Sequence, residues 1–296
     1  MNAALSVSAD DISGFNGQTS LLPTLQADGF ILLNTRGFDV EQFSSLIKPL
    51  VKRLTFDPAR DFASDAAQTV DAGTDAVGLH IENGNTPMPP DLVSFYSAKS
   101  ASVGAQTTVS DGVAILQSMP AALKEAFAQP FTMTRYLPKA IWQRYVATAF
   151  GIDNPDTVDK VLLDRFIGGI PGQSYTEAQE GGIDYCLAIP AIRADNLAAK
   201  PAFANALLGP SYNYQTPIYR FADGSVISDA IIEELNAIGE EHTREIQWQD
   251  GDIAIIDNKR VMHGRRQITV PLSERKLFIA MGLEPSFSNN PTRTSV

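Results

Sequence analysis

The sequence has one cysteine, Cys186, in 296 residues, so no disulfide can form within the chain. A chain with so little cysteine fits a reducing compartment. The opening stretch, MNAALSVSADDISGFNG, has no lysine or arginine and no continuous apolar run. It therefore lacks the order of charge and then apolar residues that marks a secretory signal. Together these absences predict a cytoplasmic protein.

Long apolar runs and excess positive charge are also missing. No window approaches the roughly 18 uninterrupted apolar residues that a membrane-spanning helix requires. The chain has 34 acidic and 23 basic residues, giving a net charge of −11. Binding to a phosphate backbone needs a basic surface, so the composition argues against nucleic acid as a partner. We expect neither a nucleic-acid nor a membrane partner.

The residues that are present suit one globular domain of enzyme size. Apolar residues make up 44% of the chain, which is enough to bury a full core. The stretch LLPTLQADGFILLNTRG predicts a short helix, a turn at Gly29 and a strand. The stretch DVEQFSSLIKPLVKRL has apolar residues at helical spacing after an acidic start, which predicts a second helix. Residues 55–77 lack a clear period and are interpreted as a loop.

From residue 77 onward the pattern changes to short segments rich in β-forming residues. VGLHIEN, PDLVSFYSA, GAQTTVSD, IDYCLAIPAI and TPIYRF are each bounded by glycine, proline or aspartate. Residues 111–127 and 229–243 have helical patterns, and the second has an amphipathic stripe. REIQWQ, a tight DGD turn and the strand IAIIDNKRVMHGRR then predict a pair of adjacent strands.

These elements favour a mainly β fold with flanking helices, an α+β protein built on a double-sheet β-barrel. The sequence has no βαβ alternation and no glycine-rich phosphate loop, which argues against a Rossmann fold. We expect residues 1–296 to form a single domain. Residues 130–182 are long for a connection, and we interpret them as a lid or insertion that covers the functional site.

Histidine is scarce, and one of the three histidines has an acidic residue two positions later. His80 and Glu82 flank Ile81 in the motif LHIENGN. In an extended strand, residues two apart project from the same face, so the imidazole and the carboxylate would lie side by side. By itself the motif HIE is a weak signal, because a chain with this many acidic residues contains such a pair frequently by chance.

Two further residues complete an ordered set. His263 lies far along the chain in GDIAIIDNKRVMHGRR, and Arg275 follows at the start of another apolar strand. Two neutral imidazoles and one carboxylate on one face of an iron(II) ion leave adjacent positions open for a substrate and for dioxygen. The arginine is suited to a bidentate, charge-assisted pair with a carboxylate, which lysine would imitate poorly.

With these residues the sequence resembles the TauD/TfdA-like iron(II)- and 2-oxoglutarate-dependent dioxygenases, in particular their clavaminate-synthase-like branch, which has His-x-Glu where most members have His-x-Asp. The resemblance covers nearly the whole chain. It rests on LQADGFILLNTRGFD, LHIENGNTPMPPDLVSFYS, GAQTTVSDGVAILQSMP, DGDIAIIDNKRVMHGRR and SERKLFIAMGL.

The resemblance implies a site and a fold. His80, Glu82 and His263 would be the metal ligands, and Arg275 would bind the distal carboxylate of 2-oxoglutarate. Thr107 would hydrogen-bond the same cosubstrate, although the adjacent Thr108 fits the motif nearly as well. The implied fold is a double-stranded β-helix, also called a jelly roll or cupin-like fold. The implied cofactors are iron(II), 2-oxoglutarate as cosubstrate, and O2.

One position departs from the family pattern. Relatives that act on free amino acids or a sulfonate commonly have a second arginine four positions after the cosubstrate arginine, and here that position is Ile279. An isoleucine cannot pair with an anion, and an unpaired carboxylate in an apolar site is costly. The substrate acid would then be masked, absent, tethered to a carrier protein, or held by another basic residue. Arg265, Arg266 and Arg135 are the candidates for that role.

We therefore expect an oxygenase that hydroxylates or desaturates a small molecule, such as an amino-acid-derived natural-product intermediate, with release of succinate and CO2. Halogenation is disfavoured, because halogenases of this superfamily have glycine or alanine where Glu82 stands. Two alternatives stay open at this point. One is a barrel that binds a metal or a small acid without catalysis, and the other is a zinc hydrolase that uses the same ligands.

Overall fold

A computed structural model describes residues 5–6, 17–71, 73–209 and 216–287. Its largest element is a seven-stranded sheet with the order β1-β2-β15-β6-β17-β3, to which β4 is added through β17. All of its pairs are antiparallel except β1 with β2. The strands are β1 (Leu5–Ser6), β2 (Phe30–Asn34), β3 (Val51–Thr55), β4 (Gln68–Thr69), β6 (Leu92–Lys99), β15 (Asp252–Asp257) and β17 (Lys276–Pro285).

A four-stranded antiparallel sheet, with the order β14-β7-β16-β5, packs against this large sheet. Its strands are β5 (Val77–His80), β7 (Thr107–Asp111), β14 (Thr243–Ile246) and β16 (Val261–Arg265). The two sheets share one buried cluster, with Phe95 and Ile279 from the large sheet and Val109 and Val261 from the small one. Strand alternation then places every second residue of β16 toward this inner cluster.

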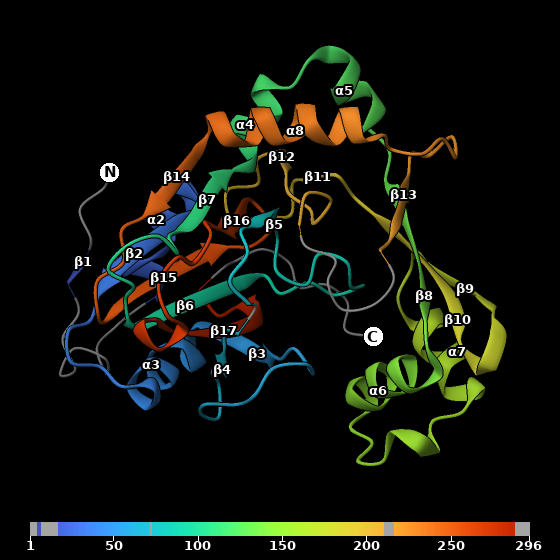
Figure 1. The fold of residues 1–296 in the computed structure, drawn as a ribbon, viewed down its shortest axis with the longest axis horizontal. Coiled ribbons are helices and arrows are strands. Elements are labelled where there is room, and N and C mark those ends of the chain that lie inside the picture. The colour runs from blue at the N-terminus through green and yellow to red at the C-terminus, as the bar shows by residue number, and fades with distance from the viewer. Residues whose placement is uncertain (1–4, 7–16, 72, 210–215, 288–296) are drawn as a thin grey trace.

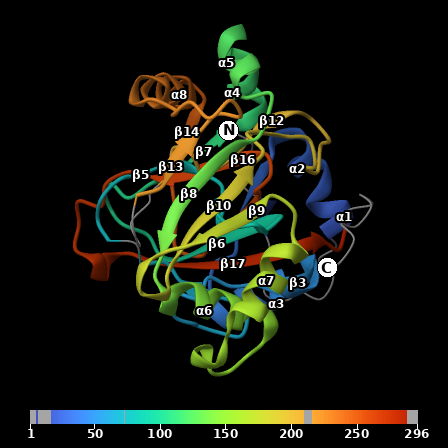
Figure 2. The same ribbon diagram turned by 90° about the vertical axis from the view of Figure 1, so that its right-hand side faces the viewer.

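The segment predicted as a lid or insertion forms a sheet of its own, here called the outer sheet. It has the order β13-β8-β10-β9 and stands to one side of the two packed sheets (Figures 1 and 2). Its strands are β8 (Phe131–Leu137), β9 (Gln173–Glu177), β10 (Ile183–Ile189) and β13 (Ile218–Arg220), with helices α6 (Lys139–Phe150) and α7 (Lys160–Gly169) between β8 and β9. The unit thus extends beyond residue 182, because β10 and β13 complete the sheet.

The outer sheet and the small sheet share a second buried cluster. Leu79 and Met262, the neighbours of His80 and His263, belong to it together with Phe131 and Trp142. Because successive strand residues alternate between faces, Leu79 and Met262 pack outward while the two histidines face the inner side. The histidine strands are therefore held from both faces.

Local sequence signals account for the N-terminal elements. Helix α2 (Leu22–Asp28) follows α1 (Gly17–Ser20) and ends at Gly29, whose φ of 77° allows the tight turn into β2. Helix α3 (Val40–Ile47) begins at Asp39, which forms a capping box with Gln42. The predicted second helix stops earlier than its pattern indicated. The 3-10 helix η2 (Lys48–Leu50) and strand β3 follow it, because VKRLT pairs with β17 and the sheet overrides local helical spacing.

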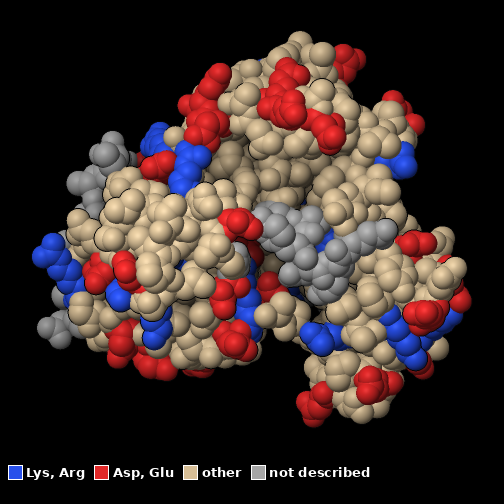
Figure 3. Space-filling view, viewed as in Figure 1, with Lys and Arg blue, Asp and Glu red and all other residues tan. Residues whose placement is uncertain are grey.

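The remaining helices cover one end of the small sheet. Residues 111–127 form two helices, α4 (Gly112–Ser118) and α5 (Ala121–Ala126), because Pro120 interrupts the run. Helix α8 (Asp229–Glu241) lies beside them (Figure 1), and acidic side chains gather over it (Figure 3). The smaller elements are η3 (Pro155–Thr157), η4 (Gln179–Gly181), β11 (Ile192–Arg193), β12 (Ala202–Phe203) and η5 (Leu272–Glu274).

The mainly β architecture with flanking helices agrees with the prediction, but one strand pairing was wrong. The DGD turn does not join paired strands, because β14 pairs with β7 while β15 pairs with β2 and β6. The predicted continuous strand to His263 also divides, since β15 ends at Asp257 and β16 begins at Val261 in the other sheet. In the described part of the chain, no helix is long and apolar enough to cross a membrane.

Candidate metal centre

His80 is the last residue of β5 and lies directly opposite His263 on β16. Its Nδ1 lies 2.8 Å from the carbonyl oxygen of Gly78, which accepts a hydrogen bond from the Nδ1–H tautomer and leaves Nε2 as the lone-pair donor. Burial, followed by the charge of His263, lowers the pKa of His80 to about 4. The imidazole is therefore neutral at pH 7, as a metal ligand must be.

Glu82 lies in the turn after β5, so the predicted extended geometry is not how it reaches the site. Asn258 fixes its backbone. Glu82 N donates to Asn258 Oδ1 at 2.8 Å, and Asn258 Nδ2 donates to Glu82 O at 3.1 Å. The same Nδ2 also donates to the carbonyl of Pro90 at 2.9 Å. Asn258 therefore supports Glu82 through the backbone.

The two carboxylate oxygens of Glu82 have different partners. Oε1 accepts a hydrogen bond from Arg60 Nη2 at 2.9 Å, while Oε2 lies 3.3 Å from His263 Nε2. Burial opposes ionisation of Glu82, but the charge of Arg60 and the hydrogen bond from His263 outweigh it, so its pKa is below the ordinary value. The carboxylate is charged at pH 7, and its Oε2 faces the histidines.

His263 completes a three-residue group, here called the metal cluster: His80, Glu82 and His263. Glu82 and His263 are buried, and His80 is half-buried. One ligand atom from each residue lies within 4.8 Å of the others. The two imidazole rings have centroids 4.5 Å apart, and the edge of Phe95 packs on His263 at 5.2 Å. Two imidazole nitrogens and one carboxylate oxygen are a donor set that fits iron(II).

Thr107 is the first residue of β7, and Arg275 directly precedes β17. Arg265 connects them, because it is opposite Thr107 and its charge acts on Arg275. The place where these three residues lie is here called the cosubstrate end. Thr107 is opposite Arg265, and Val109 is opposite His263, on the paired strands β7 and β16. Directly opposed residues share a sheet face, so Thr107 is on the face of His263, whereas Thr108 is on the other. The Oγ1 atom of Thr107 accepts a hydrogen bond from Trp248 Nε1 at 2.9 Å.

Two arginines make the cosubstrate end strongly cationic. Burial, and then the charge of Arg265, lowers the pKa of Arg275 to about 10, so Arg275 stays protonated at pH 7. Among the residues that the structure describes, no carboxylate forms an ion pair with Arg275. Arg265 donates through Nη2 to the carbonyls of Gly73 and Asp75. A carboxylate would form with Arg275 the charge-assisted pair that no described residue forms.

Ile279 is fully buried in the cluster between the two sheets, so it leaves no room for an anion. Arg266 is engaged elsewhere, in ion pairs with Glu240 and Glu245 at the surface. Arg135 is on β8 of the outer sheet. The three basic residues that the sequence left as equal candidates therefore lie in different parts of the fold.

Sequence reasoning missed Arg60, Trp248 and the buried role of Arg265. Arg60 is the one basic residue in the acidic segment 55–77, and that isolation was a signal available in the sequence. Its Nη1 atom is buried and has no hydrogen-bond partner among the described residues. The contact with Glu82 could not be predicted, because the segment has no period from which to place it.

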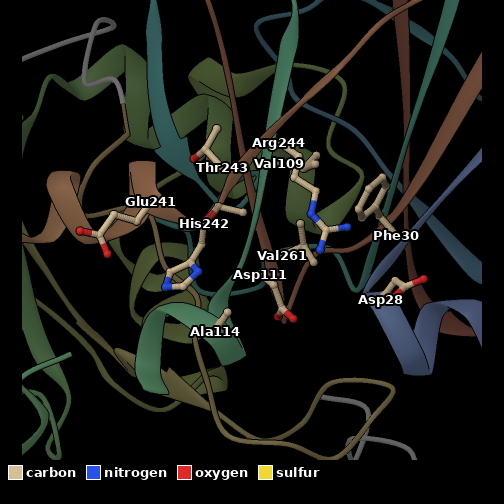
Figure 4. Close-up of a pocket in the computed structure, with 11 residues that line it drawn as sticks. Asp28, Phe30, Val109, Asp111, Ala114, Glu241, His242, Thr243, Arg244 and Val261 are labelled. Carbon is tan, nitrogen blue, oxygen red and sulfur yellow. The ribbon is translucent and has the colours of Figure 1, made fainter. Parts of the chain in front are cut away.

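A further cavity lies at the end of α8. It has a volume of about 260 Å3 and lies beside the junction of α8 and β14, where His242 and Arg244 project near Asp111 (Figure 4). None of the three predicted metal ligands lines it. His242 lies at the C-terminal end of α8, and its Nε2 is 2.7 Å from Ser118 Oγ.

Comparisons with known proteins agree with this geometry. Residues 16–281 match the family "Taurine catabolism dioxygenase TauD, TfdA family". The dapdiamide synthesis protein DdaC of Enterobacter agglomerans is 23% identical over 290 residues, which cover 86% of this chain and 84% of DdaC.

Two solved structures share the fold. A taurine dioxygenase from Burkholderia xenovorans has a TM-score of 0.58 at 11% identity, covering 95% of this chain and 87% of its own. An asparagine oxygenase, solved with Fe(II), 3-hydroxyasparagine and succinate, has a TM-score of 0.53 at 14% identity, covering 93% of this chain and 82% of its own.

The chain belongs to the TauD/TfdA family, because the family match spans most of its length. It is an iron(II)- and 2-oxoglutarate-dependent dioxygenase, and its cofactors are iron(II) and 2-oxoglutarate with O2 as oxidant. These findings give no support to the zinc hydrolase or to the non-catalytic barrel.

Proposed function

We propose that this enzyme hydroxylates or desaturates a small, amino-acid-derived intermediate of natural-product synthesis. One observation carries the proposal, namely the convergence of His80, Glu82 and His263 within 4.8 Å. The relatives add the direction of the chemistry, since DdaC acts in dapdiamide synthesis and the asparagine oxygenase was solved with a hydroxylated amino acid. A carrier-protein-tethered substrate is a further expectation of this proposal.

The metal ligands we propose are Nε2 of His80, Oε2 of Glu82 and Nε2 of His263. The hydrogen bond from His80 Nδ1 to Gly78 supports the first assignment, and the split partners of the Glu82 carboxylate support the second. Arg60 would keep Oε1 occupied, so that Glu82 binds through one oxygen and leaves the neighbouring positions open. Asn258 would hold the backbone that delivers this carboxylate.

Arg275 and Thr107 would hold the distal carboxylate of 2-oxoglutarate. The charge balance at the cosubstrate end supports this, since two protonated arginines lie there without a described acidic partner for Arg275. The position of Thr107 on the His263 face favours it over Thr108. The cosubstrate chain would then run between the two sheets toward the metal cluster.

Iron(II) and 2-oxoglutarate, when bound, supply the oxidising power for C–H cleavage, with O2 consumed and succinate and CO2 released. The protein's own part is to place the substrate carbon and to exclude water. Phe95 and Ile279 form an apolar wall beside the ligands. We propose that the outer sheet, with α6 and α7, acts as the lid over the substrate.

The paired sheets support interpretation of the core as a double-stranded β-helix, in one domain over residues 1–296. Two sheets, antiparallel apart from the β1–β2 pair, enclose one apolar cluster and have the metal cluster on their inner face, as a jelly roll requires. A reducing cytoplasm would suit a chain with a single cysteine and a ferrous cofactor.

Succinate formation tests the function directly. Purified protein with iron(II), ascorbate and 2-oxoglutarate under air should release succinate slowly, and faster when a substrate is added. Omission of oxygen should stop the release. If no succinate forms with or without candidate substrates, the proposed function is wrong.

A further inference from the structure

The outer sheet contains a small cavity that differs from the metal cluster in its chemistry. It has a volume of about 70 Å3 and lies between the strands β8 and β10 and the helices α6 and α7. Its lining is mostly apolar and aromatic, with Met133, Trp142, Leu163 and Tyr185 among the contributors. In this setting a charged side chain requires an explanation.

Arg135 is that charged side chain. Met133, Arg135 and Leu137 are alternate residues of β8 and all line the cavity. Arg135 lies opposite Tyr185 on β10, so its guanidinium stands on an apolar face that the two helices cover. Its Nε atom is buried and has no hydrogen-bond partner among the described residues. A buried N–H without a partner carries a desolvation cost that an anion bound in the cavity would remove.

A second polar atom in the same cavity is also unpaired. Asn85 Nδ2 donates to the Tyr219 hydroxyl at 3.0 Å, while Asn85 Oδ1 is buried and has no partner in the described structure. The cavity therefore offers a cationic donor and a neutral acceptor. Asn85 lies three positions after Glu82, so the loop that carries the proposed carboxylate ligand continues directly into the cavity wall.

We propose that Arg135 and Asn85 form the subsite that binds the acidic end of the primary substrate, whose carboxylate pairs with Arg135 and whose N–H group donates to Asn85 Oδ1. This inference rests on the proposed function, because it identifies the substrate class as a carboxylate-bearing amino-acid derivative. It accounts for Ile279 as well. Because Arg135 of the outer sheet binds the anion, no arginine is needed at position 279, and Ile279 can be part of the apolar core.

The size of the cavity limits what enters it. Pockets for whole drug-sized ligands usually measure about 300–1,000 Å3, whereas this one has about 70 Å3. It would take a carboxylate with a short branched apolar group, such as an isobutyl side chain, and leave the remainder of the molecule outside. The part that is oxidised would then extend along the loop of residues 83–87 toward the metal cluster.

The test uses N-acetyl-L-leucine as the probe, since it combines a carboxylate, an N–H group and an isobutyl side chain. Its uncharged counterpart, N-acetyl-L-leucinamide, is the matched probe. Binding of each to the full-length protein with iron(II) and 2-oxoglutarate is measured by calorimetry under argon, so that no turnover occurs. The wild type should bind the acid at least about tenfold more tightly than the amide, as expected for one charge-assisted pair.

Variants assign the effect to the subsite. Arg135→Gln should weaken binding of the acid by about tenfold or more and remove the preference over the amide, while Arg135→Lys should keep part of it. Asn85→Leu should weaken both probes by a smaller factor. Arg144→Gln, an exposed arginine on α6, is the control and should bind both probes as the wild type does. Circular dichroism and the melting temperature verify that each variant is folded.

The proposal is overturned if the wild type binds neither probe, if it does not distinguish the acid from the amide, or if folded Arg135→Gln keeps the wild-type affinity. Failure here is distinguishable from failure of the proposed function. Succinate release by the wild type without any probe reports on the metal cluster and the cosubstrate end alone. An enzyme that makes succinate but shows none of the expected probe binding would keep its function and lose this subsite.

Discussion

The metal cluster and the cavity of the outer sheet, here called the outer cavity, differ in how far the chain's own contacts orient their functional groups. At the metal cluster, Gly78 orients His80, and Asn258 and Arg60 orient Glu82, through the chain's own contacts. His263 Nδ1 and Arg60 Nη1 are the buried atoms there that have no partner in the described structure. In the outer cavity, Arg135 and Asn85 retain buried polar atoms without partners in the described structure. The first region is preorganised by the fold, whereas the second depends on a ligand for its missing contacts.

The cosubstrate end lies between these extremes. Thr107 has a partner in Trp248, but Arg275 has no described carboxylate to pair with. The three regions should therefore respond differently to substitution. Substitutions in the preorganised region should alter metal binding and the stability of the metal-free protein, whereas substitutions in the incomplete regions should alter ligand affinity.

The largest effect is expected at the cluster itself. Glu82→Ala and His263→Ala should each abolish iron binding, because two remaining ligands cannot hold iron(II) against water and the lost side chain has no substitute nearby. The measurement is bound iron per chain after anaerobic loading and desalting. His242→Ala is the control, since this histidine contacts Ser118 far from the cluster. Iron retained at one per chain in Glu82→Ala would remove Glu82 from the ligand set.

How far the sequence predicted this site depends on the kind of information each residue carries. His80, Glu82 and His263 could be chosen because histidine is rare here and the motifs around it are specific. Their meeting was foreseen for the wrong local reason, since Glu82 lies in a turn and not in a strand. Its approach is set by Asn258, a contact across the fold that no local spacing encodes.

The fold shows the same division. The turn at Gly29 and the acidic start at Asp39 are local signals, and both were predictive of the elements around them. The DGD turn was misleading, because a turn specifies that the chain reverses and leaves open which sheet each strand joins. Arg60 was missed for a similar reason, since its partner comes from a different element.

The cosubstrate end should respond in ligand affinity alone. Arg275→Ala should raise the 2-oxoglutarate concentration needed for half-maximal succinate release by about 10- to 100-fold, which is the usual loss for a charge-assisted hydrogen bond. The 2-oxoglutarate requirement of Arg275→Lys should lie between those of the wild type and Arg275→Ala, because an ammonium keeps the charge but cannot form the bidentate pair. Bound iron per chain is measured for both variants and should equal that of the wild type, in contrast to the variants of the metal cluster. An unchanged 2-oxoglutarate requirement would contradict the assignment.

The preorganised region should also make the metal-free protein sensitive to acid. The pKa of His80 is lowered from 6.5 to about 4 in the folded state, so between these values the unfolded chain binds more protons. Stability is then fully present above pH 6.5 and falls as the pH drops toward 4, by on the order of 2 kcal/mol. Urea unfolding of wild type and His80→Gln across this range measures it. The variant should show the shallower dependence, and parallel curves would contradict the lowered pKa.

Arg60 offers a sharper test of the same region. Arg60→Met should weaken iron binding by about tenfold, because the residue orients Glu82 without touching the metal, and supporting residues of this kind typically contribute 10- to 100-fold. Arg53→Met, an exposed arginine on the neighbouring strand β3, is the matched control. Calorimetric titration with iron(II) under argon compares the two. Equal affinities would mean that the Arg60 contact with Glu82 does not support metal binding.

The smallest expected effect distinguishes two adjacent threonines at the cosubstrate end. Thr107→Val removes one neutral hydroxyl and keeps the side chain's shape. It should raise the 2-oxoglutarate requirement by about a few-fold, which is the effect expected from the loss of one neutral hydrogen bond. Thr108→Val should have no such effect, because Thr108 faces away from His263 across the β7–β16 pair. Succinate release at graded 2-oxoglutarate concentrations measures both. The reverse order of effects would shift the assignment by one residue and would show that β7 presents its other face to the cosubstrate.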